Sequence, residues 1–458
     1  MDKTAKTLID FTSNLQFSDL SPISIKAAKA RIVSTIAVSL AAFDLEPVRI
    51  VRKLVQRVKD APAASIFGTL LKTTPDMAAF VNSAMVRCLD MSDTSVRAAV
   101  SHPADAFSSI LAVAEAEGLS GEDLLLATAI IYEVQCRFVE VVPYNHHGWD
   151  QTPVVALGAA LGCSRLLGLA EEPMYHAIAL AVTPNLALNQ TRTGKLSMWK
   201  GMAGPHGARG GVFSAYLARA GMTGPEDVFE GKFGLWRQMM GGARFDLPIP
   251  VDFKNHVFAV QQTMIKSFPT RFNCQVPVFA AQKLRAMVNV NDIESLTIES
   301  IRQAFDRWVA LPEIWKPETR ETADHSLPCT VSMALLDGTI TPHMMDTGRF
   351  KDQDVLDLIG KSKIELPDEF AELAPETRCC RLTAKMKYGE TVVAEYRRSL
   401  ADDIADPGWD QAHEKFMSLT KDLLSPNTQK KLLAFVKSLE RKKTVAPLIR
   451  MTKLDSKR

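Results

Sequence analysis

The sequence predicts a mainly helical protein in which a large helical domain, formed by both ends of the chain, is interrupted by a smaller α+β insertion. Three observations lead to this fold class. Apolar residues recur at helical spacing through about the first 240 residues, alternate with polar residues over 380–396, and return to helical spacing from about Asp403. The predicted domains are residues 1–262 with 402–458, and residues 263–401.

Two helix starts in the first part are well marked. Ser21 is placed to cap a helix that Pro22 begins. Ser120 and Asp123 form a variant of the capping box. The stretch Leu124–Val134 that follows is apolar nearly all round, which predicts a helix buried inside a large helical domain.

The pattern changes near residue 245, where the insertion is expected to begin. Leu247–Pro250, with two prolines, is typical of a linker. Ile293–Ile298 is strand-like, and apolar residues alternate with polar ones along Cys380–Met386. Tyr388–Glu390 then predicts a hairpin turn that leads into a second strand over Val392–Tyr396.

Composition excludes several classes of protein. The chain has 458 residues, 47% apolar and 23% charged, with a formal net charge of +2, so no strong field favours nucleic acid or a membrane surface. No apolar run approaches the roughly 20 residues of a membrane span, and the start is not a secretory signal. The seven cysteines include no Cys-x-x-Cys pair, which indicates reduced thiols in a cytoplasmic protein. Because the net charge is only +2, any positive charge that serves function must be concentrated in a pocket.

One candidate site lies in the first part of the chain. Leu89–Thr94 and Ser101–Asp105 bring three carboxylates, several hydroxyls and an imidazole close together in sequence. The proline after His102 biases that residue away from helix and favours a loop, where scaffolds commonly present reactive groups. The alternative is a solvated turn in which Asp93 and Asp105 only cap helices.

A second candidate is rich in cations and glycines. Arg192–Gly201 and Gly204–Gly211 together hold four cations and six glycines, without the order of a phosphate-binding loop. The glycines could expose backbone amides to an anion, or let helices approach closely, as in the Ala- and Gly-rich stretch Pro153–Leu169. The alternative is a loop with a solvated basic face.

Two further candidates lie in the insertion. Lys266–Arg271 is at the seam between the two patterns, where a ligand cleft is common, although a surface linker is the alternative. Glu321–Pro328 contains Asp324 beside His325, which could form part of a site or cap a helix.

Together these segments resemble the MmgE/PrpD family, whose members include 2-methylcitrate dehydratases and cis-aconitate decarboxylases. The likeness spans most of the chain, in order. Its motifs are Ser65–Gly68 with Asn82, Leu89–Thr94, His102–Asp105, Arg192–Gly201, Gly221–Asp227 with Phe229–Gly231, Lys266–Pro269 and Ala323–Pro328. The resemblance implies a large all-helical domain with the smaller α+β domain as a lid, a homodimer, and neither a metal nor a cofactor.

The resemblance also implies an active site. The expected catalytic residues are His102, Asp90, Lys200 and Lys266. The expected substrate-binding residues are Thr94, Asp93, Arg209, Asp150, Arg271 and His325. The sequence departs from the decarboxylases at Ser267 and Arg271, where they carry arginine and histidine, and this disfavours a decarboxylase.

These residue types suit the dehydration of a small hydroxy-polycarboxylate such as 2-methylcitrate. A base must remove a proton next to a carboxylate, and cations such as Lys200, Lys266 and Arg209 would stabilise the charge that develops. Imidazole, with an ordinary pKa of about 6.5, suits acid–base work near neutral pH. Asp90 could orient His102 or be the base itself. The alternatives are an isomerase or epimerase, a decarboxylase acting on a related polycarboxylate, and a binding protein without activity.

Overall fold

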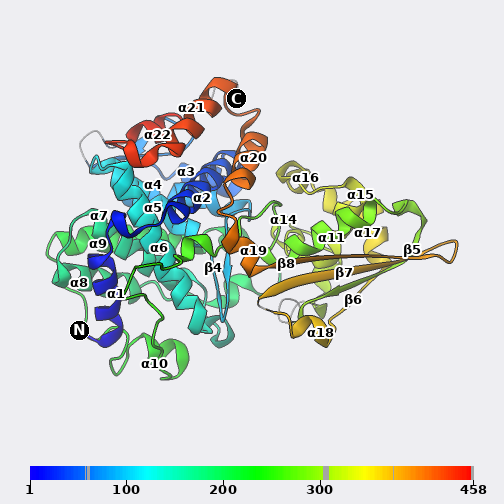
Figure 1. Cartoon of the computed structure of the whole chain (residues 1–458), viewed down its shortest axis with the longest axis horizontal. Helices are drawn as coiled ribbons and strands as arrows, with labels where there is room; N and C mark the ends of the chain where they lie inside the picture. The colour runs from blue at the N-terminus through cyan, green and yellow to red at the C-terminus, as the bar shows by residue number, and fades with distance from the viewer. Residues whose placement is uncertain (57, 59–61, 303–308, 375, 455–458) are drawn as a thin grey trace. The chain divides into compact units, whose positions relative to one another are not determined.

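The computed structural model describes residues 1–56, 58, 62–302, 309–374 and 376–454. Within these ranges the chain is mainly helical, with one four-stranded mixed sheet in its C-terminal part (Figure 1). No helix among the described residues is long and apolar enough to cross a membrane. The chain divides into two compact units. The helical unit comprises Met1–Thr191, Gly201–Ile265 and Asp406–Arg458, and the mixed unit comprises Arg192–Lys200 and Lys266–Ala405.

The helical unit contains thirteen α-helices within its described residues and two short antiparallel strand pairs. The helices are α1 (Lys3–Asn14), α2 (Pro22–Ala41), α3 (Glu46–Arg52), α4 (Pro75–Cys88), α5 (Phe107–Ala116), α6 (Gly121–Val141), α7 (Thr152–Leu166), α8 (Glu171–Val182), α9 (Ala203–Arg219), α10 (Leu235–Met240), α20 (Trp409–Thr420), α21 (Pro426–Lys437) and α22 (Ala446–Arg450). The strand pairs are β1 (Ala64–Ser65) with β2 (Lys72–Thr73), and β3 (Ser95–Val96) with β4 (Val100–Ser101).

The predicted helix starts are confirmed. The Ser21 side chain accepts a hydrogen bond from the Ser24 amide, and Pro22 is the first residue of α2. Ser120 and Asp123 form the expected capping box at the start of α6. Nearly all of α6 is buried, as its all-round apolar pattern predicted.

Glycines let α7 and α9 approach closely, which confirms one of the two interpretations of the glycine-rich segments. A Cβ atom added to Gly211 of α9 would lie 2.7 Å from the Ala156 carbonyl oxygen of α7. On the other side of α7, a Cβ atom on Gly162 would lie 2.6 Å from a methyl group of Ile131 in α6. α7 and α9 are thereby held at backbone contact, and α6 packs on α7 through the Ile131 side chain.

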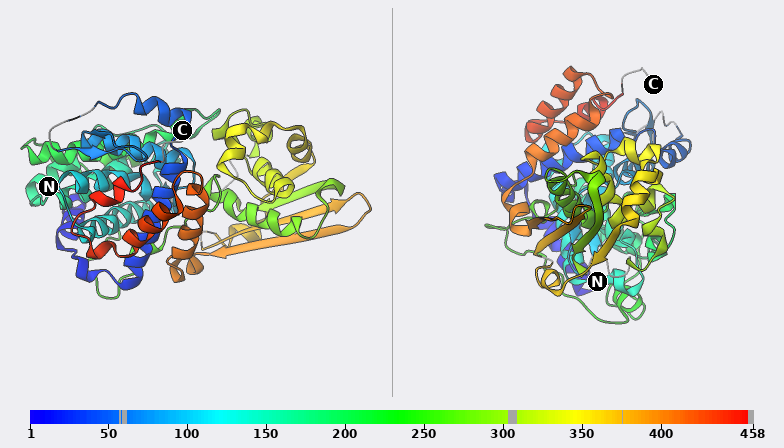
Figure 2. Two further views of the ribbon diagram at one scale, coloured as in Figure 1. Left: turned by 90° about the horizontal axis from the view of Figure 1, so that it is seen from above. Right: turned by 90° about the vertical axis from the view of Figure 1, so that its right-hand side faces the viewer.

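The mixed unit is built on a sheet with strand order β6-β5-β7-β8. β5 pairs parallel with β6 and antiparallel with β7, and β7 pairs antiparallel with β8. Helices cover one face of the sheet (Figure 2), with α11 packed on β7 and β8 and with α15 packed on α11. The strands are β5 (Ile293–Ser300), β6 (Ser362–Glu365), β7 (Thr377–Met386) and β8 (Thr391–Ser399). The helices are α11 (Gln275–Arg285), α13 (Pro312–Trp315), α14 (Arg320–Ala323), α15 (Leu327–Asp337), α16 (Pro342–Thr347), α17 (Gln353–Gly360), α18 (Asp368–Ala371) and α19 (Leu400–Ala405).

The predicted strands and hairpin are confirmed. Alternate residues of β7 from Cys380 to Met386 are buried. Gly389 occupies the turn to β8 with φ of +88°, a conformation that favours glycine.

The predicted linker at Leu247–Pro250 is wrong. Its prolines keep it irregular, but Leu247 and Ile249 are buried in the core of the helical unit. The chain instead passes into the mixed unit between Ile265 and Lys266. Arg192–Lys200 belongs to the mixed unit, although its position in the sequence predicted that it belongs to the helical domain.

Candidate active site

The end of α4 shapes the first part of the candidate site. Asp90 follows the helix with φ of +52°, in the left-handed region. Aspartate and asparagine tolerate this region better than most residues other than glycine, and it is common just after a helix. The Asp90 carboxylate accepts a hydrogen bond of 2.6 Å from Nη1 of Arg87, and both side chains are buried. A buried ion pair therefore closes this end of α4.

His102 lies beside that ion pair. It follows β4 and precedes a 3₁₀ turn over Pro103–Ala106, with φ of −117° and ψ of 84°, so the expected non-helical backbone is confirmed. Its Nδ1 atom is 2.9 Å from Oγ1 of Thr94 and 3.2 Å from the Asp93 carbonyl oxygen. Its Nε2 atom is 3.2 Å from Nη2 of Arg87. Neighbours on both sides thus fix the orientation of the imidazole.

Gln151 supports the backbone of His102. Its Oε1 accepts a hydrogen bond of 3.1 Å from the His102 amide, and its Nε2 donates to Oδ2 of Asp105 at 3.0 Å. Asp105 in turn lies 3.7 Å from Nε of Arg87. Sequence reasoning missed both Arg87 and Gln151. The available signals were weak: Arg87 stands three residues before Asp90, and Gln151 is next to Asp150.

The alternative of a solvated turn with two caps is wrong. His102, Asp93 and Asp105 are all buried, and neither aspartate caps a helix.

The Asp93 carboxylate points into the interior of the helical unit. Its Oδ1 accepts a hydrogen bond of 3.1 Å from the Tyr132 hydroxyl, and its Oδ2 accepts one of 2.7 Å from Thr263. Burial raises the pKa of Asp93, and the positive charge of Arg31 opposes part of that rise. Asp93 reaches His102 through its backbone carbonyl, while its side chain joins α6 to the segment before the mixed unit.

Two other expected binding residues have structural partners. Oδ1 of Asp150 accepts from the amide and the hydroxyl of Thr152, at 3.2 and 2.9 Å, where α7 begins. Nε of Arg209 is 3.1 Å from Asp76 at the start of α4. At about 1.5 Å per residue, the 14 residues of α4 carry the chain about 20 Å from that point before Asp90 follows. The structure therefore does not bring Arg209 to His102, because Arg209 lies on the face of α9 that meets the other end of α4.

The mixed unit holds a second cluster of site residues. Nζ of Lys200 is 2.8 and 3.0 Å from the two carboxylate oxygens of Asp324. Nδ1 of His325 contacts the same carboxylate and lies 3.1 Å from the Lys200 ammonium group. Lys200 is buried, so a solvated basic face describes only residues such as Lys195, which is exposed and 3.0 Å from Glu318.

The capping interpretation is confirmed for Asp324, which is the C-cap residue of α14 and donates its backbone amide to the Arg320 carbonyl oxygen. The side chains of Thr319 and Ser326 cap the N-termini of α14 and α15, so the Asp324 side chain remains available to Lys200 and His325. Asp324, which was not among the expected site residues, is the centre of this cluster.

Gln275, the first residue of α11, holds the Lys266–Arg271 loop. Its Oε1 accepts hydrogen bonds from the amides of Ser267 and Phe268, at 2.9 and 3.2 Å. Its Nε2 donates to the Phe268 carbonyl and to the Thr270 hydroxyl, at 3.0 and 2.7 Å. Lys266 is buried, so the surface-linker alternative is wrong.

The same loop is tied to the Lys200 cluster. The Arg271 amide donates to the Asp324 carbonyl oxygen at 2.7 Å. Burial raises the pKa of the nearby Cys274 thiol to about 11, although the positive charge of Arg271 lowers it in part. Cys274 is therefore a neutral thiol near pH 7 and not a nucleophile.

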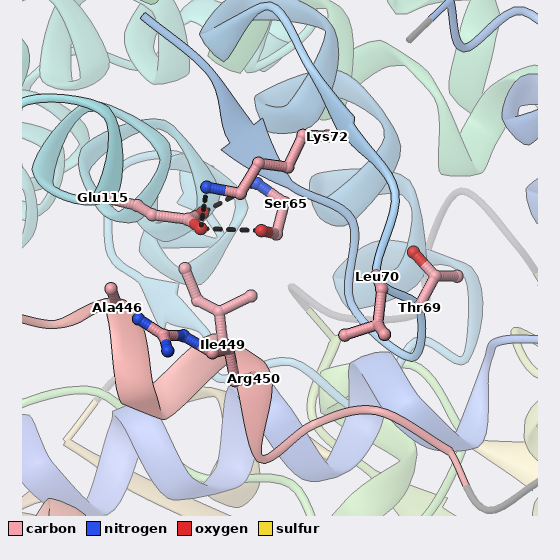
Figure 3. Close-up of a pocket in the computed structure, with 8 residues that line it drawn as sticks. All are labelled: Ser65, Thr69, Leu70, Lys72, Glu115, Ala446, Ile449 and Arg450. Atoms are coloured by element: carbon pink, nitrogen blue, oxygen red, sulfur yellow. Dashed lines mark hydrogen bonds and ion pairs between the residues drawn. The ribbon is translucent and has the colours of Figure 1, made fainter. Parts of the chain in front are cut away.

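The first motif of the resemblance has a structural role. Asn82 accepts from the Phe67 amide and donates to the Ser65 carbonyl, both at 2.9 Å. Glu115 accepts from the Ser65 amide and hydroxyl, at 2.7 and 2.6 Å, beside a cavity of about 220 Å³ (Figure 3). Lys72 completes the group, 3.6 Å from Glu115. These contacts fix the β1–β2 turn rather than contribute to the cluster around His102.

The helical unit thus sets a buried imidazole among carboxylates and a guanidinium, and the mixed unit sets a buried ammonium beside a carboxylate and an imidazole. The chain belongs to the MmgE/PrpD family: the family's N-terminal domain matches residues 6–248 and its C-terminal domain matches residues 268–441.

Its relatives are lyases, and their names give two different reactions, decarboxylation and dehydration. The chain is 25% identical over 407 residues to cis-aconitate decarboxylase of Mus musculus, a match that covers 83% of this chain and 78% of the relative. It is 25% identical over 362 residues to 2-methylcitrate dehydratase of Escherichia coli, covering 74% and 72%. It is 27% identical over 301 residues to 2-methylcitrate dehydratase of Cupriavidus necator, covering 61% and 60%.

Proposed function

We propose that this chain is a hydro-lyase that dehydrates a small hydroxy-polycarboxylate resembling 2-methylcitrate. The observation that carries the proposal is the buried imidazole of His102, oriented by Thr94 and by the Asp93 carbonyl beside the Arg87–Asp90 ion pair. A buried and oriented imidazole is the side chain best suited to accept a proton from carbon near neutral pH. The names of the relatives supply the substrate class, since 2-methylcitrate and cis-aconitate are both tricarboxylates.

Chain connectivity supports a joint role for the two lysines and His102. Met264, two residues before Lys266, pairs with Thr94 through two backbone hydrogen bonds of 3.1 Å. Gly201, directly after Lys200, packs on Cys88 so closely that a Cβ atom there would lie 3.2 Å from Sγ. In sequence, Lys200 and Lys266 are therefore one and two residues from backbone that is anchored in the helical unit.

The reaction uses these groups as follows. His102 accepts a proton from the carbon next to a substrate carboxylate, and the electrons of that C–H bond form the new C=C bond. The protonated imidazole then donates a proton to the hydroxyl on the neighbouring carbon, the C–O bond breaks, and water leaves with His102 again neutral. Lys200 and Lys266 stabilise the negative charge that develops on the carboxylate, because cations act most strongly when they are already oriented and shielded from water. Asp90 holds Arg87 and so supports the imidazole.

Decarboxylation is the second candidate, because the mouse relative aligns with a larger share of the chain than the dehydratases do. The two reactions are distinguished by their products. Dehydration releases water and leaves every carboxylate in place, whereas decarboxylation releases CO₂. Ser267 and Arg271, which differ from the decarboxylase pattern, favour dehydration.

The test incubates the purified chain with 2-methylcitrate, citrate and cis-aconitate in D₂O, with products followed by proton NMR and by released CO₂. We expect alkene formation from a hydroxy acid. His102→Gln should lower kcat by roughly 100- to 10,000-fold, whereas His413→Gln, at an exposed position, should not. Likewise Lys200→Met should abolish turnover and Lys195→Met should not. Release of CO₂, deuterium exchange without loss of water, or full activity in His102→Gln would overturn the proposal.

A further inference from the structure

Within the helical unit, the buried guanidinium of Arg87 contacts Asp90, His102 and Asp105. Nη1 donates to Asp90 at 2.6 Å, Nη2 lies 3.2 Å from Nε2 of His102, and Nε lies 3.7 Å from Asp105. We propose that Arg87 is a positioning residue that holds His102 as the neutral tautomer protonated on Nδ1, with an unprotonated Nε2. The catalytic part of this inference rests on the proposed function, but the tautomer does not.

The Arg87 contact determines the state of one ring nitrogen. A guanidinium group carries N–H donors and no acceptor. A hydrogen bond between Nη2 and Nε2 therefore requires a lone pair on Nε2. If Nε2 carried a proton, two N–H groups would face each other at 3.2 Å inside a buried site.

The contacts at the other ring nitrogen lead independently to the same tautomer. The Asp93 carbonyl oxygen, 3.2 Å from Nδ1, is an acceptor only, so it favours a hydrogen on Nδ1. The Thr94 hydroxyl, 2.9 Å from Nδ1, can donate or accept and is compatible with this arrangement. An acceptor on one side and a donor on the other together select the Nδ1–H form.

This assignment names the atom that does the chemistry. In the proposed reaction Nε2 of His102 accepts the substrate proton, while the Nδ1–H bond to the Asp93 carbonyl keeps the ring from turning. The contact between Arg87 and His102, at 3.2 Å, is longer and weaker than the 2.6 Å hydrogen bond between Arg87 and Asp90. Substrate can therefore replace Arg87 at Nε2 of His102 while the Arg87–Asp90 ion pair stays intact. Asp90 and Asp105 compensate the guanidinium charge, which is the condition for burying it here.

A lysine could not replace Arg87 in this role. The planar guanidinium reaches three partners in fixed directions, whereas an ammonium group is a single point charge on a flexible stem. Arg87→Lys therefore keeps the charge and removes the geometry. Arg49→Lys, at an exposed position on α3, is the matched control.

The experiment reads the tautomer directly. Protein labelled with ¹⁵N in histidine is examined by two-dimensional ¹H–¹⁵N NMR without ligand, and the His102 signals are assigned by their loss in His102→Gln. We expect a protonated Nδ1 and an unprotonated Nε2 in the wild type and in Arg49→Lys, and a mixture with the Nε2–H form in Arg87→Lys. An Nε2–H form in the wild type would overturn the inference even if Arg87→Lys failed to fold, and so would an unchanged pattern in folded Arg87→Lys.

In Arg87→Lys we expect kcat to fall on the order of 100-fold with little change in KM. The substitution misplaces the imidazole of His102, which reacts, and leaves the groups that bind substrate unchanged. An unchanged kcat in folded Arg87→Lys would overturn the positioning role. If the NMR pattern is as expected but no hydroxy acid is dehydrated, the tautomer assignment stands and the proposed function fails.

Discussion

A methyl group at Gly204 is the smallest change that would disturb the support of His102. Gly204 lies in the first turn of α9, and a Cβ atom there would overlap Oδ2 of Asp105 and lie 3.3 Å from Nε2 of Gln151. These two atoms form the hydrogen bond that holds Gln151 under the His102 amide. Gly204→Ala therefore acts on the proposed site through its support, without removing a polar group.

The expected cost follows from the geometry. Asp105 must withdraw by about 1 Å to clear the methyl group, and overpacking of this kind destabilises by about 1–3 kcal/mol. Alanine offsets this by at most about 1 kcal/mol through its higher helix propensity. We expect a net loss of stability of about 1–2 kcal/mol. Because misplacement near 1 Å can lower rates roughly 100-fold, kcat should fall by up to that factor.

The assay compares Gly204→Ala with Gly360→Ala. Gly360 ends α17, and no atom would lie within 4 Å of a Cβ added there, so this variant should be as stable as the wild type or slightly more so. Urea unfolding gives the stability, and turnover of the hydroxy acid identified above gives kcat. Wild-type stability and kcat in Gly204→Ala would show that the Asp105–Gln151 contact does not support His102.

Two further predictions concern stability. Burial would raise the pKa of Glu133, but hydrogen bonds from His256 and the Ala259 amide, together with the charge of Arg137, lower that pKa below 4.5. The ionised Glu133 carboxylate therefore stabilises the folded protein fully above pH 4.5. This stabilisation is lost as the pH falls through the pKa that Glu133 has in the folded state. Glu133→Gln should cost about 3 kcal/mol at pH 7 and progressively less below pH 4.5, and equal costs at pH 7 and pH 3 in urea unfolding would contradict this. Asp90→Ala should be less stable than Asp90→Asn by about 1 kcal/mol, because alanine tolerates the positive φ less well, and equal urea midpoints with equal slopes would contradict it.

The sequence predicted the features of the fold that depend on neighbouring residues. The caps at Ser21 and Ser120 and the alternation along β7 are local patterns, and the structure confirms them. Leu247–Pro250 was misinterpreted because proline signals irregular backbone but does not report whether Leu247 and Ile249 are buried.

The candidate site was only partly predictable for a related reason. The residues around His102 that share its loop were identified. Arg87 and Gln151 were missed because their roles depend on contacts made after folding, across 15 and 49 residues of sequence. Arg209 was expected near the substrate from its position in a motif, but the direction in which α9 presents it is a tertiary property.

The short segment Arg192–Lys200 limits how the protein can be divided or recombined. It belongs with residues 266–405 although 65 residues of the helical unit separate them in sequence. A chimera that exchanges only residues 266–405 between two relatives would join the Asp324 of one parent to the Lys200 of the other. Modular exchange of the mixed unit therefore needs two simultaneous grafts, and natural variation at Lys200 and Asp324 should be inherited as a pair.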